Sequence, residues 1–134
     1  MYDLVFNAQN NPDLIIGIDR TFNLGKLYLT SLCYKNIRYK KSNGTNPIKL
    51  GPMFLHREAT QEQYTMFLSF IKNRIGSISL DLEISFDGTI DFGSDQEKAI
   101  TNSIDLIFPE GKRKLCYLHL KDNLIHKMRV IQTS

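Results

Sequence analysis

The sequence predicts a single α/β domain built on a mixed β-sheet. An apolar, β-branched segment at residues 14–22 is typical of a central strand buried on both sides. Two amphipathic helical segments follow, and further strand-like runs come after each of them. Strands separated by helices imply parallel crossovers beside an antiparallel start. No internal repeat or linker divides the 134 residues, so one domain is expected over 1–134.

Composition is that of a folded, non-membrane protein. Hydrophobic residues make up 42% of the chain and charged residues 23%, which excludes a disordered chain. No apolar run approaches the roughly 20 residues that cross a bilayer, and the first residues lack the features of a secretion signal. Two cysteines, Cys33 and Cys116, fit a reducing compartment. We therefore expect an intracellular protein.

Three strands are predicted in the N-terminal half. The first covers 14–22, and turn residues at 23–26 connect it to a second strand at 27–34, so the two are expected to form a hairpin. A polar segment at 42–47 predicts a loop. The third strand is expected at 51–56.

A first long helix begins where Thr60 and Gln63 have capping-box spacing. Its apolar stripe consists of Tyr64, Phe67, Leu68, Ile71 and Ile75. Gly76 is predicted to end this helix. Strict apolar alternation from Ile78 to Phe86 then predicts a strand, and a turn at 87–88 leads to a short run at 90–92. The two runs form either one bent strand or a hairpin.

A second helix is predicted after another apparent capping box, Ser94 and Glu97. Its inward stripe consists of Ile100, Ile104, Ile107 and Phe108, and Pro109 ends it. A last strand is expected at 114–120 and a last helix at 122–131, with Leu124, Ile125, Met128 and Ile131 inward.

Two aspartates stand where strands are predicted to end. Asp19 interrupts the most apolar stretch of the chain, and a buried carboxylate is costly unless it is paired. It either pairs with Arg20, Lys26 or water, or holds a divalent metal such as Mg²⁺. Asp95 follows the run at 90–92; acids are also common in the first turn of a helix. If their strands are neighbours, the two carboxylates meet, and a shared cation relieves their repulsion.

Six short motifs occur in order along the chain. They are residues 16–25 (IGIDRTFNLG), 28–30 (YLT), 50–56 (LGPMFLH), 92–99 (FGSDQEKA), 108–109 (FP) and 116–119 (CYLH) with Asn123. Together they resemble the central block of Mutator-like element (MULE) transposases, from about residue 13 to 128. Gln96 departs from the family pattern, which commonly has glycine after the second aspartate.

The resemblance implies an RNase H-like fold of the DDE superfamily. Its sheet is mixed and five-stranded, with three antiparallel strands followed by parallel strands and crossover helices. The catalytic aspartates of the family fall on Asp19 and Asp95, and His119 of the Cys-x-x-His element is implied to position groups near the active site or to contact DNA. The third acid, a glutamate, normally lies downstream of that element, so we expect a partial catalytic domain, truncated before this acid and inactive or nearly so by itself.

The chemistry implied by the resemblance is DNA strand cleavage and transfer in transposition, in the nucleus. Carboxylates that hold Mg²⁺ or Mn²⁺ ions support in-line displacement at phosphorus. The implied partners are DNA, as transposon ends and target, and other copies of the chain, with no membrane and no small-molecule substrate. Four basic residues are expected to contact phosphates: Lys112, Arg113, Lys114 and Lys121.

Three other interpretations of the candidate site residues are open. A zinc site at Cys116 and His119 is disfavoured because His126 and the distant Cys33 and His56 are the other candidate ligands, and a structural site needs four. A nuclease of RNase H type would add Glu62 or Glu58 to Asp19 and Asp95. A domesticated, catalytically dead module would bind nucleic acid or protein and keep the fold without its chemistry.

Overall fold

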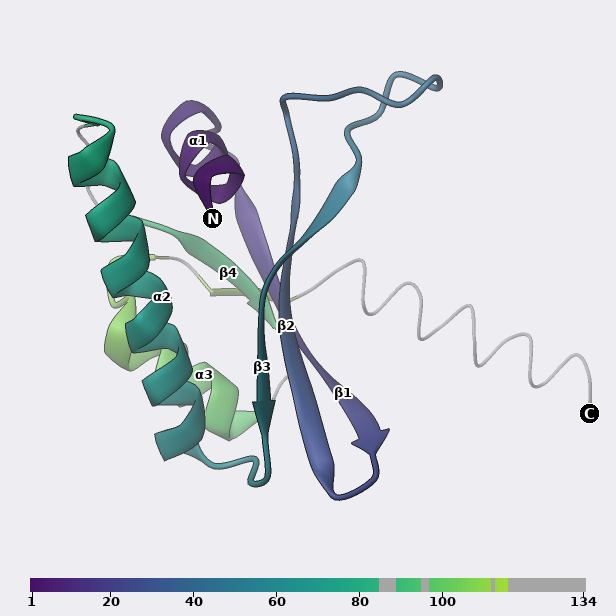
Figure 1. Ribbon diagram of the computed structural model, residues 1–134, viewed down its shortest axis with the longest axis vertical. Coiled ribbons are helices and arrows are strands. Elements are labelled where there is room, and N and C mark those ends of the chain that lie inside the picture. The colour runs from purple at the N-terminus through teal and green to yellow at the C-terminus, as the bar shows by residue number, and fades with distance from the viewer. Residues whose placement is uncertain (85–88, 95–96, 112, 116–134) are drawn as a thin grey trace, which may run out of the picture.

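The computed structural model describes residues 1–84, 89–94, 97–111 and 113–115 of the chain (Figure 1). Along the sequence its elements are α1 (Tyr2–Asn10), β1 (Ile15–Leu24), β2 (Leu27–Lys35), β3 (Ile48–His56), α2 (Gln61–Asp81), β4 (Asp91–Ser94), α3 (Lys98–Ile107) and β5 (Arg113–Leu115). The predicted strand at 114–120 and helix at 122–131 lie largely outside the described residues.

The described strands form one mixed sheet with the order β3-β2-β1-β4-β5. The first three strands are antiparallel to one another, because β2 pairs with both β1 and β3. The later strands are parallel: β4 pairs with β1, and β5 pairs with β4. The expected α/β class with antiparallel and parallel strands in one sheet is therefore confirmed.

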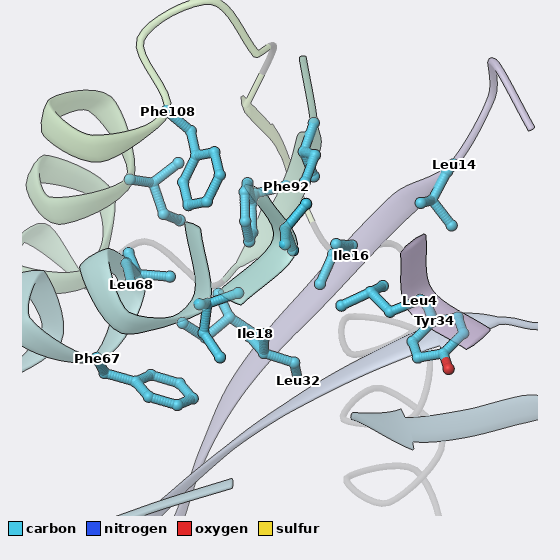
Figure 2. Close-up of a cluster of buried hydrophobic side chains, with 14 of the residues drawn as sticks. Leu4, Leu14, Ile16, Ile18, Leu32, Tyr34, Phe67, Leu68, Phe92 and Phe108 are labelled. Atoms are coloured by element: carbon cyan, nitrogen blue, oxygen red, sulfur yellow. The ribbon is translucent and has the colours of Figure 1, made fainter. Parts of the chain in front are cut away.

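The helices α1, α2 and α3 lie on the same face of this sheet (Figure 1). The core fills the space between them and the strands, and Figure 2 shows part of it. Ile16 and Ile18 of β1 are almost completely buried there, as is Leu32 of β2. Phe92 of β4 packs on Phe108 after α3, with ring centroids 4.9 Å apart. The buried apolar residues of β1 and β2 thus lie on the face of the sheet that the helices cover.

The opposite face, here called the open face, carries exposed apolar side chains. Cross-strand pairing places Gly17, Cys33 and Leu50 in one row across β1, β2 and β3. Leu50 is 63% exposed. Other exposed apolar residues of this face are Ile15, Ile48, Met53 and Leu55. A methyl group added to Gly17 would lie 2.8 Å from the Cys33 Sγ, so the sulfur packs directly against the glycine.

The predicted end of the first helix was wrong. α2 continues through Gly76 to Asp81, so the strand expected from Ile78 onward begins as helix, while residues 85–88 lie outside the described part. Ile78 is fully buried, one turn after Ile75, and extends the helical stripe. Burial of this stripe outweighs the cost of about 1 kcal/mol for one exposed glycine in a helix. The apolar alternation that begins at Ile78 therefore wrongly predicted a strand here. Leu80, one of its apolar residues, is 80% exposed on the helix.

The prediction of a second capping box at Ser94 and Glu97 was also wrong. Ser94 is the last residue of β4, and Glu97 is the residue that caps α3, without a side-chain hydrogen bond to the helix. Its carboxylate binds Arg20 instead, as described below. Pro109 follows the helix end at Ile107, as expected. The helix α1 was not predicted at all.

Candidate active site

Asp19 lies on β1, directly after the last described pair of this strand with β4. The parallel register places Ile18 opposite Ser94, and the antiparallel register places Asp19 opposite Ser31 of β2. Because Ile18 points into the core, the alternation of the strand turns Asp19 to the open face, where it is half-buried. The predicted first carboxylate therefore lies at a strand position accessible from solvent.

Asp95, the predicted second carboxylate, lies outside the described residues, as does Gln96. Its chain neighbour Ser94 is described, is buried, and ends β4. The described pairing of β1 with β4 therefore extends to the residue directly before each predicted aspartate, Ile18 on β1 and Ser94 on β4.

An ion pair crosses from β1 to the start of α3, on the helix-covered face behind Asp19. The Arg20 Nη1 lies 3.1 Å from the Glu97 Oε1, and both side chains are about four-fifths buried. The guanidinium also stacks over the Tyr28 ring, at 5.0 Å from its centroid. Among the partners proposed for Asp19 was Arg20; the described ion pair of this arginine is made with Glu97.

The hydroxyl of Tyr64 joins this ion pair from α2. It donates a hydrogen bond of 3.4 Å to the same Glu97 oxygen that binds Arg20. Burial, and next to it the negative charge of Glu97, raises the pKa of Tyr64 to about 12. Tyr64 therefore keeps its proton at neutral pH and acts as a donor. The network ties three elements together: β1, α2 and the N-terminus of α3.

The described residues do not form a metal site by themselves. Within residues 1–84, 89–94, 97–111 and 113–115, no three His, Cys, Asp or Glu side chains gather closely enough to hold an ion. Glu97 is engaged by Arg20, which leaves Asp19 as the carboxylate that the described part contributes at this edge. A cation here needs a donor beyond the described residues, and Asp95 is the first candidate.

The nuclease alternative is not supported by the position of its third acid. Glu62 is an exposed residue in the first turn of α2, and this helix covers the face of the sheet that carries Ile16 and Ile18. Asp19 alternates to the open face. The sheet itself thus lies between the two carboxylates. Glu58, the other candidate, is exposed in the segment between β3 and α2.

His56 has a structural role that the sequence did not reveal. It is 4% exposed and stacks on Phe54, with ring centroids 4.7 Å apart. Its Nδ1 lies 2.8 Å from the carbonyl oxygen of Glu58 and donates to it, while its Nε2 lies 2.8 Å from the Thr30 hydroxyl. His56 points to the helix-covered face and Cys33 to the open face, so the two cannot share a zinc ion.

The remaining predicted residues are not placed. His119, Cys116, His126, Lys112 and Lys121 lie outside the described residues. Arg113 and Lys114 belong to β5, which pairs with β4 at the sheet edge. The predicted DNA contacts of these basic residues therefore stay predictions.

Comparison with known proteins yields no assignment. No protein-family model matches the chain, and no curated protein matches it significantly. In the part of the chain that the structure describes, no helix combines the length and apolar character that a membrane crossing requires.

Proposed function

We propose that this chain is part of the catalytic core of a Mutator-like DDE transposase, and that Asp19 and Asp95 belong to its active site. One observation carries the proposal. Ile18 and Ser94 are the last described pair of the parallel strands β1 and β4, and each of these residues directly precedes one of the two aspartates.

The topology is a second support. Three antiparallel strands, a helix, a strand, a helix and a strand occur in this order, and the sheet order is β3-β2-β1-β4-β5. Three antiparallel strands followed by parallel strands with crossover helices is the arrangement that the motif resemblance implies for an RNase H-like catalytic domain.

The spacing of neighbouring strands in a β-sheet would bring the two aspartates close enough to share a cation. Neighbouring strands lie about 4.8 Å apart, so two carboxylates at matching positions would repel each other without a cation between them. Mg²⁺ or Mn²⁺ accepts such oxygen ligands. Asp19 and Asp95 would hold the ion, which when bound would polarise a phosphodiester of DNA and activate a water or a 3′-hydroxyl.

The network behind the aspartates has a positioning role in this proposal. Arg20 follows Asp19 directly, and Glu97 lies two residues after Asp95. Their ion pair, together with the Tyr64 hydroxyl, fixes the end of β1 relative to the start of α3. A carboxylate pair needs such rigid support, since catalytic geometry tolerates displacements of only about 0.5 Å.

The proposal includes a DNA partner, a nuclear location and self-association during transposition, all of which follow from the motif resemblance. It also includes low activity. The motif resemblance assigns two of the three DDE acids, Asp19 and Asp95, so the 134 residues by themselves are expected to nick DNA weakly or not at all in Mg²⁺ or Mn²⁺.

Binding of Mn²⁺ tests the proposal without requiring activity. Titration of the chain with Mn²⁺, followed by the electron paramagnetic resonance signal of the free ion, is expected to show a bound ion. Asp19→Asn and Asp95→Asn should each abolish this binding. Asp91→Asn is the matched control, because Asp91 lies on the same strand as Ser94 but at the opposite end, beside Ile15. Equal binding by all four proteins would contradict the proposal.

A second candidate is the non-catalytic, domesticated module. The observation in its favour is that the core of the fold does not include Asp19, so such a module would keep the fold without the chemistry. Such a module would bind nucleic acid or protein but no Mn²⁺. The same titration therefore separates the two candidates.

A further inference from the structure

We infer that the β2–β3 ribbon and its connecting loop form a surface that binds the phosphate backbone of a nucleic acid. The first observation is a separation of charge along the chain. Between Asp19 and Glu58 there is no acidic residue, whereas there are eight basic ones: Arg20, Lys26, Lys35, Arg38, Lys40, Lys41, Lys49 and Arg57. The whole chain has a net charge of only +3, so the rest of the molecule is acidic.

Five of these eight residues lie in the loop that connects β2 to β3 or at the ends of the strands beside it: Lys35, Arg38, Lys40, Lys41 and Lys49. The loop at 36–47 projects away from the helices and the body of the sheet (Figure 1). Lys35, Lys40 and Lys41 are exposed there, and neither Lys40 nor Lys41 forms an ion pair with another described residue. Such a projection carries positive potential into solvent, where it attracts polyanions.

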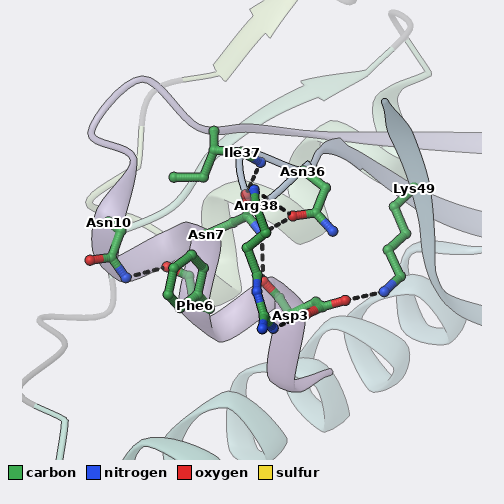
Figure 3. A network of polar contacts seen from close by, with 8 residues as sticks. All are labelled: Asp3, Phe6, Asn7, Asn10, Asn36, Ile37, Arg38 and Lys49. Atoms are coloured by element: carbon green, nitrogen blue, oxygen red, sulfur yellow. Dashed lines mark hydrogen bonds and ion pairs between the residues drawn. The ribbon is translucent and has the colours of Figure 1, made fainter. Parts of the chain in front are cut away.

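The base of the loop is fixed to α1 by buried polar groups (Figure 3). The Asn7 Nδ2 donates a 3.1 Å hydrogen bond to the Asn36 Oδ1, and both side chains are almost fully buried. The Asn7 Oδ1 accepts a 2.8 Å hydrogen bond from the Ile37 N–H. Asp3 of α1 then binds Arg38, in the first part of the loop, and Lys49, which lies just after the loop on β3.

The tip of the loop is also ordered by hydrogen bonds. The Lys41 N–H donates to the Thr45 carbonyl oxygen at 2.7 Å, and the Gly44 N–H donates to the Lys41 carbonyl oxygen at 2.9 Å. Gly44 has a φ of +83°, which favours glycine in this turn. The Asn46 side chain donates to the Tyr39 carbonyl oxygen at 2.9 Å. The lysines are therefore presented on a preorganised loop, which lowers the entropy lost on binding.

Two features favour a nucleic acid over an anionic membrane. Tyr39 is 57% exposed between Arg38 and Lys40, where its ring is available for stacking on a base. The tip at 42–45 consists of exposed polar residues and glycine, with no apolar side chain to insert among lipid tails.

This surface gives the proposed function a DNA-contacting element, but it depends on neither Asp19 nor Asp95. The two proposals therefore fail separately. Lysine contacts to phosphate release counterions, so binding should weaken steeply with salt and should show little sequence preference.

The test measures anisotropy of a labelled DNA duplex of arbitrary sequence, and of an RNA duplex of the same sequence, at several salt concentrations. The double variant Lys40→Glu/Lys41→Glu should bind DNA at least about tenfold more weakly, and the slope of log affinity against log salt should become shallower by about 1.8, for two lost contacts. The matched control, Arg74→Glu/Lys98→Glu, reverses two exposed charges on α2 and α3 and should bind like the wild type.

Binding of either duplex through Lys40 and Lys41 supports the inference, and the comparison of DNA with RNA identifies the source of the phosphates. Equal weakening by both double variants would overturn it, because net charge alone would then explain binding. Absence of duplex binding would also overturn it, as would binding of phosphatidylserine vesicles without binding of either duplex. Unchanged thermal melting of the two double variants ensures that folding is not the cause.

Discussion

Among single residues, Asp3 has the most consequential set of contacts outside the candidate active site. Its carboxylate accepts a 2.6 Å hydrogen bond from Arg38 and a second hydrogen bond from Lys49. The bond from Lys49, and next to it the bond from Arg38, hold the pKa of Asp3 below its usual range, although partial burial opposes this. Asp3 thus links α1 to both ends of the basic loop.

The lowered pKa of Asp3 predicts a pH-dependent contribution to stability. The contribution is fully present above the usual carboxyl pKa of 3.8 and is lost as the pH falls through the lower value of the folded state. Asp3→Asn should therefore lower the free energy of unfolding at pH 7 by up to about 1 kcal/mol. Urea titrations at several pH values should show this difference shrinking towards zero in strong acid.

Asp13→Asn is the matched control for this experiment. Asp13 is exposed in the turn before β1 and makes no ion pair with another described residue, so its substitution should leave stability nearly unchanged. An Asp3→Asn effect that persists unaltered below pH 3 would show that the ion pairs are not its cause.

At the scale of elements, the extent of α2 is the most informative difference between the sequence analysis and the structure. Gly76 is exposed, and nothing lies within 4 Å of the position where its Cβ would be. The glycine therefore serves no packing purpose, and α2 runs through it because Ile75 and Ile78 are buried on either side.

Gly76→Ala should consequently stabilise the protein by about 0.5–1 kcal/mol, because alanine loses less backbone freedom on folding. Chemical denaturation measures this difference. Gly44→Ala is a matched control, since its Cβ would also meet open space but its φ of +83° disfavours a side chain. It should destabilise. Destabilisation by Gly76→Ala as well would contradict a helix that continues through residue 76.

The elements whose signals were local and strong were predictable. β1, β2 and α3 have apolar residues at the spacing that places them in the core, and the start of α2 has a cap in which the Thr60 hydroxyl accepts from the Gln63 N–H. α1 was missed because its stability depends on tertiary partners. Leu4 and Val5 are buried against the sheet and α2, and Asn7 binds Asn36, which is 29 residues away along the chain.

The candidate active site was predictable only in part, for the same reason. Asp19 is conspicuous because a carboxylate interrupts an apolar strand. The Arg20–Glu97 ion pair is not, because it joins residues 77 positions apart and Glu97 has the sequence context of a capping residue. The open face was likewise hidden, since alternation shows that a strand has two faces but not which one the helices cover.

At the scale of the whole molecule, the chain divides its tasks by location. The helices cover one face of the sheet and build the core, while Asp19 lies on the other face, next to the last described pair of β1 and β4. The loop that connects β2 to β3 projects away from the sheet (Figure 1). In the two proposals, this loop contacts the backbone of a nucleic acid and Asp19 belongs to a separate site.

The convergence of Asp19 and Asp95 is the central claim, and cross-linking measures it most directly. In a chain with Cys33→Ser and Cys116→Ser, the pair Asp19→Cys/Asp95→Cys should form an intramolecular disulfide on mild oxidation, because a disulfide spans Cα atoms about 4.4–6.8 Å apart. The control pair Asp19→Cys/Asp91→Cys places the second thiol four residues earlier, near Ile15, and should not cross-link. If the control pair formed the disulfide and the Asp95 pair did not, the two aspartates could not share a cation and the proposed active site would be wrong.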